Sequence, residues 1–147
     1  MEDGRMDRER YELPIEVRPE DIDELGHVNN VVYLRWVQEA AMAHWRARAT
    51  AEDQAALFWV VRRHEIDYVR PAFLDTGVLA RTWVGTATRR KFERHTELVR
   101  ATDEKRLVRA RTVWVPVDSE TLRPTDVSDT VRARFSAGGA ADAAGGP

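Results

Sequence analysis

Apolar and polar residues follow two different periods along this chain, one before and one after about residue 50. Across residues 30–48, apolar side chains cover most of a helical circumference. Only a narrow polar stripe remains, formed by Arg35, Gln38, Glu39 and Arg46. This pattern predicts a long helix that other elements surround on most of its sides.

Four later segments alternate apolar and polar residues or are enriched in β-branched and aromatic residues, which is typical of strands. They are Leu57–Val69, Val78–Ala87, Lys91–Arg100 and Leu107–Val117. A first strand is expected at Tyr11–Arg18, before Pro19. A polar loop at 19–29 then leads into the helix.

The connections between these elements indicate how they assemble. The link at 101–105 is short enough to make its flanking strands an antiparallel hairpin. Residues 127–135 are expected to form either a short final helix or an irregular packing segment. One antiparallel sheet cannot cover a helix on all sides, so we expect it to curl around the helix while a second copy closes the remaining face. The prediction is a wrapped α+β domain that forms a dimer or a larger assembly.

Length and composition fit one folded domain. The chain has 147 residues, of which 43% are hydrophobic and 33% charged, which is enough for one core. We expect a flexible charged arm at 1–10, the domain at 11–135 and a flexible tail at 136–147. No apolar run reaches the ~18 residues of a membrane span, and the first ten residues lack an apolar signal region. We therefore expect a cytoplasmic protein without a membrane partner.

Charge and cysteine content exclude several functional classes. The net charge is −2, from 23 basic and 25 acidic residues, which disfavours a nucleic-acid partner. The absence of cysteine excludes disulfides, thiol catalysis and cysteine-based zinc sites. Asp21, Asp23 and His27 are chemically able to bind a metal, but no second histidine cluster or recognised spacing accompanies them. We expect neither a metal nor a cofactor.

The loop before the helix concentrates the candidate chemistry. Residues 21–33 read DIDELGHVNNVVY, with two aspartates, a glycine, a histidine and two asparagines just before the apolar run. A helix N-terminus offers unpaired N–H groups and partial positive charge, which can polarise a carbonyl oxygen. A carboxylate upstream can attack that carbonyl or activate water. Asp and Asn also cap helices, but capping explains only one or two of these residues.

This loop resembles that of the hotdog-fold acyl thioesterases, in particular the 4-hydroxybenzoyl-CoA thioesterase-like family. The family pattern Asp-x-Asp-x-x-Gly-x6-Tyr is matched by Asp21, Asp23, Gly26 and Tyr33. A His-Val-Asn-Asn run like that at 27–30 also occurs in acyl-carrier-protein thioesterases. Less specific similarities follow at 64–71, which resembles the family's second strand and its exit, and at 89–95, a basic stretch.

The resemblance covers about residues 11–135 and implies a hotdog fold, in which an antiparallel sheet wraps around a long central helix. It implies that Asp23 is the catalytic carboxylate, acting either as nucleophile or as general base. The backbone amide of Asn30, beside Asn29, would polarise the carbonyl. His27 would line the site, with a direct role left open. Gly26 would let the loop turn tightly and let the substrate approach the backbone.

Further substrate contacts are implied by position. Gly26, Asn29, Tyr33 and Tyr68 would bind substrate, and the basic residues Arg89, Arg90 and Lys91 would contact the nucleotide phosphates of CoA. The competing interpretation places such aromatic residues in the core and such basic residues in solvent.

Two other carboxylates are weighed against Asp23. Asp21 is interpreted as structural, holding the loop through hydrogen bonds. Glu39 is the rival catalytic residue, because another hotdog branch uses an acidic residue further along the helix, but we place it on the polar stripe or at a subunit interface. Leu25 stands where acyl-carrier-protein thioesterases have an asparagine between Asp and His, which disfavours that version of the mechanism.

The implied activity is that of an acyl-CoA thioesterase, which releases a free carboxylic acid and CoA and works as a homodimer or homotetramer. One alternative is an acyl-carrier-protein thioesterase. Another is a non-catalytic acyl-CoA-binding hotdog protein. The identity of the acyl group is not encoded in any pattern that we find.

Overall fold

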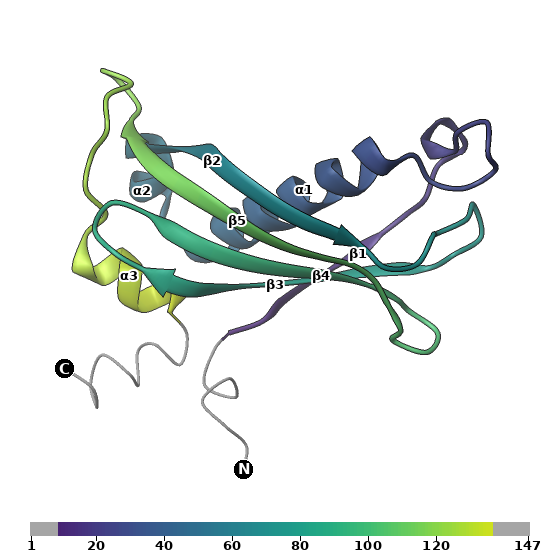
Figure 1. Cartoon of the computed structure of the whole chain (residues 1–147). Coiled ribbons are helices and arrows are strands. Elements are labelled where there is room, and N and C mark those ends of the chain that lie inside the picture. Colours follow the sequence, from purple (N-terminus) through teal and green to yellow (C-terminus); the bar gives the residue numbers. More distant parts are fainter. Residues whose placement is uncertain (1–8, 137–147) are drawn as a thin grey trace, which may run out of the picture.

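A computed structural model describes residues 9–136, and its elements follow the predicted order (Figure 1). The helices are η2 (Pro19–Asp21, a single 3-10 turn), α1 (Asn30–Arg48), α2 (Ala51–Ala56) and α3 (Asp129–Phe135). The strands are β1 (Tyr11–Ile15), β2 (Leu57–Tyr68), β3 (Val78–Ala87), β4 (Phe92–Arg100) and β5 (Arg106–Asp118). Apart from residues 9, 10 and 136, the arm and the tail predicted from sequence lie outside the described residues.

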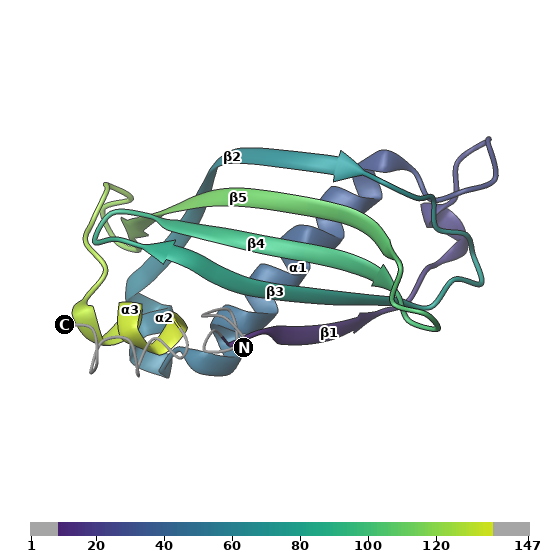
Figure 2. The ribbon, with the colours of Figure 1, turned by 60° about the horizontal axis from the view of Figure 1, so that its bottom comes forward.

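The five strands form one antiparallel sheet in the order β1-β3-β4-β5-β2. The predicted hairpin across 101–105 is confirmed, because β4 pairs with β5 on either side of that link. The sheet curves around α1, which crosses its concave face (Figures 1 and 2). This is the α+β hotdog fold that the sequence resemblance implies.

The helix α1 buries one broad face against the sheet. Its buried side chains recur at helical spacing and are Val32, Tyr33, Trp36, Val37, Ala40, Ala41, His44 and Trp45. In residues 9–136 the opposite face is largely exposed, and Val31 in the first turn is 67% exposed. The sheet of one chain therefore covers α1 on one side only, as the sequence argument for a second copy requires.

Two local features differ from the prediction. The first strand ends at Ile15 rather than Arg18, because Ile15 pairs with Val78, the first residue of β3, and no partner strand continues beyond it. The helix α2 was not predicted. Its six residues are too few for a periodic signal, although the Thr50 side chain caps it by accepting a hydrogen bond from the Asp53 N–H.

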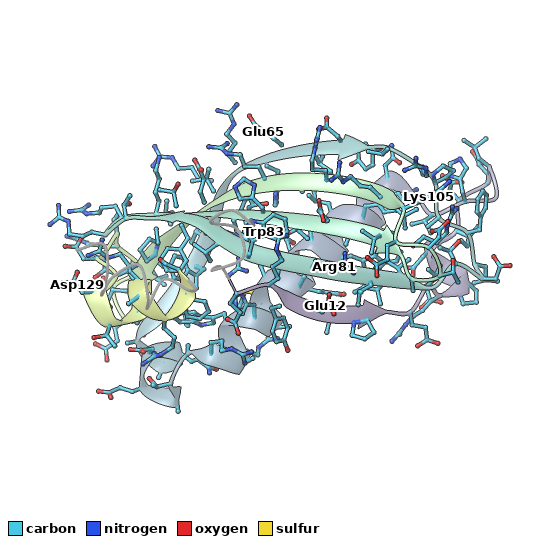
Figure 3. The ribbon with its side chains drawn as sticks, turned by 90° about the horizontal axis from the view of Figure 1, so that it is seen from below. Glu12, Glu65, Arg81, Trp83, Lys105 and Asp129 are labelled. Atoms are coloured by element: carbon cyan, nitrogen blue, oxygen red, sulfur yellow. The ribbon has the colours of Figure 1, made fainter. Side chains whose placement is uncertain are left out.

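The outer face of the sheet is polar and extensively ion-paired (Figure 3). Arg81 bonds Glu12 on the neighbouring strand, and Arg111 lies between Glu65 and Glu93. Trp83 is partly covered, because the Arg10 guanidinium lies 3.9 Å from its ring centroid. In the part of the chain that the structure describes, no helix has both the length and the apolar character that a membrane span needs.

Candidate active site

The loop between η2 and α1 folds back on itself as a tight turn. Ile22 and Val28 form an antiparallel bridge, and the Asp23 N–H donates to the His27 carbonyl at 2.9 Å. Inside the turn, the Gly26 N–H donates to the Asp23 carbonyl at 3.0 Å. Gly26 has a φ of +89°, which favours glycine, and a side chain there would meet nothing within 4 Å. The turn thus requires a glycine for its backbone conformation rather than for lack of space.

Asp23 stands at the first position of this turn. Its Oδ1 accepts a hydrogen bond from the Leu25 N–H at 2.9 Å, which fixes the carboxylate relative to the loop. Within residues 9–136, its Oδ2 accepts no hydrogen bond. The side chain is 22% exposed, so that it is accessible without projecting fully into solvent. One oxygen anchors the carboxylate and the other is available to a ligand.

His27 lies beside Asp23 without bonding to it. The distance from its Nδ1 to Asp23 Oδ1 is 4.0 Å, beyond hydrogen-bond length, and Nδ1 lies 3.4 Å from the Val28 carbonyl oxygen. The imidazole meets the Phe73 ring edge-on, with the centroids 6.4 Å apart. His27 therefore lines the space around the carboxylate.

Within residues 9–136, a main-chain donor at the start of α1 has no acceptor. The Asn29 side chain caps the helix by accepting the Val31 N–H at 3.0 Å, and the Asn29 carbonyl accepts the Val32 N–H at 2.9 Å. The Asn30 N–H between them has no acceptor in the described chain. This free donor, at the positive end of a 19-residue helix, is suited to binding a carbonyl oxygen or an anion.

Asp21 holds the loop against the helix. It is 1% exposed, and its carboxylate accepts the Arg18 N–H at 2.9 Å and an Arg35 N–H at 3.1 Å. Its carbonyl accepts the Asn29 N–H at 2.9 Å. The rival Glu39 lies half-exposed on the polar stripe, paired with Arg35 at 3.4 Å. These contacts give Asp21 a structural role. Asp23 stays accessible in the same loop, next to the exposed Glu24.

Two tyrosines meet at the helix start, with their ring centroids 5.7 Å apart. Tyr33 is buried, and its hydroxyl oxygen accepts the Ala72 N–H at 2.8 Å, so its role within one chain is to hold the segment after β2. Burial raises the pKa of Tyr33, and the charge of Asp23 adds to this increase. Tyr68 is 45% exposed and donates to the Asn30 carbonyl at 3.4 Å.

The predicted phosphate contacts lie elsewhere. Arg89, Arg90 and Lys91 belong to the β3–β4 turn, at the end of the sheet near α3, whereas the Asp23 loop is at the other end (Figure 1). The two arginines are mostly exposed, and both pair with Asp126, Arg90 at 2.7 Å. A single chain does not bring this turn to the Asp23 loop.

Exposed apolar side chains surround the Asp23 end of the molecule. They are Leu25, Val31, Tyr68, Val69, Phe73 and Leu74, each between 45% and 76% exposed. The sequence analysis missed Phe73 and Leu74, although two adjacent large apolar residues in a turn-rich segment are a detectable signal. Among the described residues, no three His, Asp or Glu side chains group closely enough to hold a metal ion.

Residues 17–135 match the thioesterase-like superfamily, and the chain belongs to it. The protein is therefore a thioester hydrolase, in agreement with its hotdog fold. A search of curated protein sequences gives no match.

Solved thioesterase structures share the fold. A thioesterase from Thermus thermophilus, complexed with coenzyme A and zinc, is 26% identical with a TM-score of 0.73, over 84% of this chain and 90% of that one. A 1,4-dihydroxy-2-naphthoyl-CoA thioesterase from Synechocystis is 17% identical with a TM-score of 0.75, over 86% and 96%. A 12:0-ACP thioesterase from Umbellularia californica is 19% identical with a TM-score of 0.71, over 85% and 49%.

Proposed function

We propose that this protein hydrolyses acyl-CoA thioesters to a free carboxylic acid and CoA. Asp23 is the catalytic carboxylate, and the Asn30 N–H polarises the thioester carbonyl. The observation that carries this assignment is that, among the residues the structure describes, the Asn30 N–H at the head of α1 has no acceptor and one Asp23 carboxylate oxygen accepts no hydrogen bond. A carboxylate and a free helix donor are the two groups that acyl transfer to water needs.

Thioester hydrolysis needs few further catalytic groups from the protein. As a general base, Asp23 takes a proton from water while the resulting hydroxide adds to the carbonyl carbon. As a nucleophile, it forms a mixed anhydride that water then opens. In both routes the carbon–sulfur bond breaks and the thiolate departs. Because a thiol has a pKa near ~8.5, it leaves without a strong acid. A donor such as the Asn30 N–H stabilises the oxyanion by ~3–4 kcal/mol.

The apolar rim supports an acyl substrate. Leu25, Val31, Phe73 and Leu74 are exposed around a polar loop, and exposed apolar patches mark sites for ligands or partners. His27 meets Phe73 of this rim edge-on, and the Tyr68 hydroxyl lies 3.4 Å from the Asn30 carbonyl at the head of α1. The substrate carbonyl would sit at the helix start, with the acyl group against these side chains.

We infer that the working form is a homodimer built along β2. This strand is at the edge of the sheet, and its Phe58 and Val60 are 50% and 47% exposed. An unpaired edge of this length is a template for pairing with a second copy. Two-fold pairing reverses the strand, so the Leu57 end of one copy lies near the Tyr68 end of the other. The rest of the outer face of the sheet is mostly charged and ion-paired, which disfavours a further pairing through it.

Coenzyme A is favoured over a carrier protein by the exposed Arg89, Arg90 and Lys91, which such a dimer would bring toward the catalytic end of the partner. The fold is shared with both CoA and carrier-protein thioesterases, so fold alone does not choose between them.

The test is a hydrolysis screen over short, long and aryl CoA thioesters, repeated with the same acyl groups on pantetheine and on acyl-carrier protein. We expect turnover on CoA thioesters and a KM that rises on pantetheine and in an Arg89→Ala/Arg90→Ala variant. Turnover on the carrier protein alone would establish that alternative. Tight acyl-CoA binding without any turnover would establish a non-catalytic binding protein.

A further inference from the structure

The segment that follows β2 contacts both halves of the proposed active site. Ala72 in this segment is fully buried, and its two main-chain polar groups bond in different directions. Its N–H donates to the Tyr33 hydroxyl oxygen at 2.8 Å, and its carbonyl accepts the Val28 N–H at 2.9 Å. Tyr33 belongs to α1, whereas Val28 belongs to the Asp23 loop. One residue therefore connects the helix to the loop, and we call this connection the Ala72 bridge.

A tight turn fixes the residues that come after Ala72. The Phe73 N–H donates to Thr76 Oγ1 at 2.9 Å, and the Thr76 N–H donates to the Phe73 carbonyl at 2.9 Å. The Phe73 ring in turn meets the His27 imidazole edge-on. Figures 1 and 2 show this segment next to the Asp23 loop, at the same end of the sheet. The Asp23 loop thus packs against a segment whose backbone is held by its own hydrogen bonds.

Val28 couples the Ala72 bridge to Asp23. Val28 is fully buried and forms an antiparallel bridge with Ile22, the residue before Asp23. The Asp23 N–H donates to the carbonyl of His27, the residue before Val28, at 2.9 Å. Because these bonds join the two arms of the loop, a shift of Val28 moves Asp23 with it.

A second attachment holds the Asp23 loop from another face of α1. Arg35 of the helix donates to the buried Asp21 at 3.1 Å. Tyr33 and Arg35 are two positions apart, so they project roughly 200° apart around the helix axis. A loop with one attachment can pivot, whereas attachments to two faces of the helix fix its orientation. Of the two helix side chains, Tyr33 is 2% exposed and Arg35 is 50% exposed, so water competes less with the Tyr33 bond.

Tyr33 serves the bridge as a neutral hydrogen-bonding group. Burial raises the pKa of Tyr33, and the charge of Asp23 adds to this increase. A phenol with a raised pKa keeps its proton at neutral pH and is not a base. Because the ring is buried with its hydroxyl oxygen on the Ala72 N–H, Tyr33 acts on the site through the main chain.

We propose that Tyr33 is a positioning residue, whose hydroxyl holds the Asp23 carboxylate in place relative to the Asn30 N–H through Ala72 and Val28. The inference rests on the proposed function, in which these two groups act on one thioester carbonyl. Catalytic groups must be held within about 0.5 Å of their productive geometry. A displacement of about 1 Å can lower the rate by about 100-fold. Loss of the Tyr33 hydroxyl should therefore affect turnover more than substrate binding.

The first experiment measures amide hydrogen exchange by NMR on the full chain and needs no substrate. In Tyr33→Phe, the Ala72 and Val28 amides should exchange at least about tenfold faster than in the wild type, because the Ala72 N–H loses its acceptor and the bridge opens more often. Tyr11→Phe is the matched control, since Tyr11 lies on β1 and stacks on His44 near the other end of α1. It should leave both amides unaltered. Unchanged exchange in Tyr33→Phe would overturn the inference.

The second experiment is a kinetic cycle on the CoA thioester that the wild type hydrolyses fastest, at a temperature where circular dichroism shows every variant folded. Tyr33→Phe should lower kcat by at least about tenfold and change KM by less than about twofold. Tyr11→Phe should change neither constant. In an Asp23→Asn background, Tyr33→Phe should lower the residual rate by less than about twofold, because no carboxylate remains to be positioned. An unchanged kcat in Tyr33→Phe, or an equal loss in both backgrounds, would overturn the positioning role.

These measurements separate the inference from the proposed function. If Asp23→Asn turns over at the wild-type rate, or if the wild type hydrolyses no thioester, the proposed function fails. Hydrogen exchange then still decides whether Tyr33 holds the Asp23 loop. If Asp23→Asn loses turnover while Tyr33→Phe keeps the wild-type kcat, the inference fails and the proposed function stands.

Discussion

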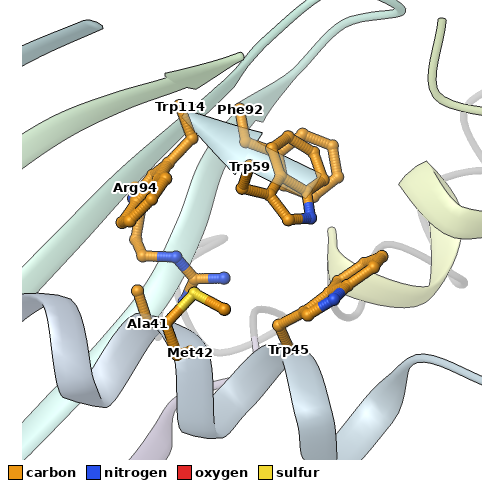
Figure 4. A pocket seen from close by; sticks show the side chains of 7 residues that line it. All are labelled: Ala41, Met42, Trp45, Trp59, Phe92, Arg94 and Trp114. Carbon is orange, nitrogen blue, oxygen red and sulfur yellow. The ribbon is translucent and has the colours of Figure 1, made fainter. Parts of the chain in front are cut away.

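The two ends of α1 are built in opposite ways. At its N-terminal end, the Asp23 loop is partly exposed and is held mainly by hydrogen bonds between residues at most 14 positions apart, such as Arg35 to Asp21. One long-range bond, from the Val28 N–H to the Ala72 carbonyl, adds to them. At its C-terminal end lies a small, largely buried pocket, here called the Arg94 pocket, whose wall consists mainly of Met42, Trp45, Trp59, Phe92, Arg94 and Trp114 (Figure 4). It is held by contacts such as Arg94 to His44, 50 positions apart. In our proposal one end presents groups to a substrate, whereas the other places a charge inside the core.

Because of this difference, we expect substitutions at the two ends to have different effects, on turnover at one end and on stability at the other. Substitutions of the accessible groups at the Asp23 end should change turnover with little effect on folding. Substitutions in the buried network at the Arg94 end, and of the buried Asp21 beneath the loop, should change the free energy of unfolding. The following predictions test that division.

The largest effect is expected for Asp21→Ala. This change removes a buried carboxylate and leaves the Arg18 N–H and one Arg35 donor without their acceptor. We expect a loss of about 3–4 kcal/mol in the free energy of unfolding, measured by urea denaturation. Glu39→Ala removes the exposed partner of the same Arg35 and should cost less than about 1 kcal/mol. Equal losses would mean that Asp21 does not hold the loop.

The next effect is a pH dependence at the Arg94 end. Burial, reinforced by the charge of Arg94 and opposed by Glu9, lowers the pKa of His44 to about 4, from 6.5 for the unperturbed side chain. The unfolded chain therefore takes up the proton more readily, and stability is lost as the pH falls from about 6.5 through 4. The loss should reach about 2–3 kcal/mol. His44→Gln should flatten urea-unfolding stability in this range, and an unchanged slope would contradict the assignment.

Gly26→Ala should have a smaller effect, at the Asp23 end. Its φ of +89° disfavours alanine by about 1–2 kcal/mol, although the added carbon meets no atom. We expect that loss in unfolding experiments, with a drop in kcat as the Asp23 carboxylate shifts. Gly77→Ala is the control, because Gly77 has no positive φ and its added carbon would make only an ordinary contact with Ala101. A Gly26→Ala variant as stable and active as the wild type would show that the turn tolerates other conformations.

The smallest effect is expected for the helix cap. Asn29→Ala removes the acceptor of the Val31 N–H and should cost about 1 kcal/mol of stability. Thr50→Ala removes the corresponding cap of α2 and should cost a similar amount. Only Asn29→Ala should lower kcat as well, because only that cap positions the Asn30 N–H. Identical kinetics in both variants would argue against a catalytic helix start.

The two ends also differ in how far the sequence predicts them. The bounds of α1 were predicted at Asn30 and Arg48, and the strand bounds agree within one or two residues except for the end of β1. Long periodic segments and a capping asparagine are local signals, so one sequence is enough to detect them. The Asp23 loop is equally local, since its turn, glycine and cap all fall within nine residues.

The Arg94 pocket could not be found in this way. It combines residues of α1, β2, β4 and β5, which the pairing register of the sheet brings together. In the sequence, alternation places Arg94 on the same strand face as Phe92 and Leu98, but nothing local shows which residues of other elements it meets there. The same limitation applies to Arg89–Lys91, whose contact with substrate stays a prediction from resemblance. Only the fold shows that this turn and the Asp23 loop lie at opposite ends of one chain.

The most direct test of the account is the kcat of Asp23→Asn on whichever CoA thioester the wild type hydrolyses fastest. Asp118→Asn is the matched control, because Asp118 also accepts main-chain N–H groups in a turn, remote from the Asp23 loop. We predict that kcat falls by at least about 100-fold in Asp23→Asn, with acyl-CoA binding retained, and stays unchanged in Asp118→Asn. An Asp23→Asn variant that turns over at the wild-type rate would contradict the central claim.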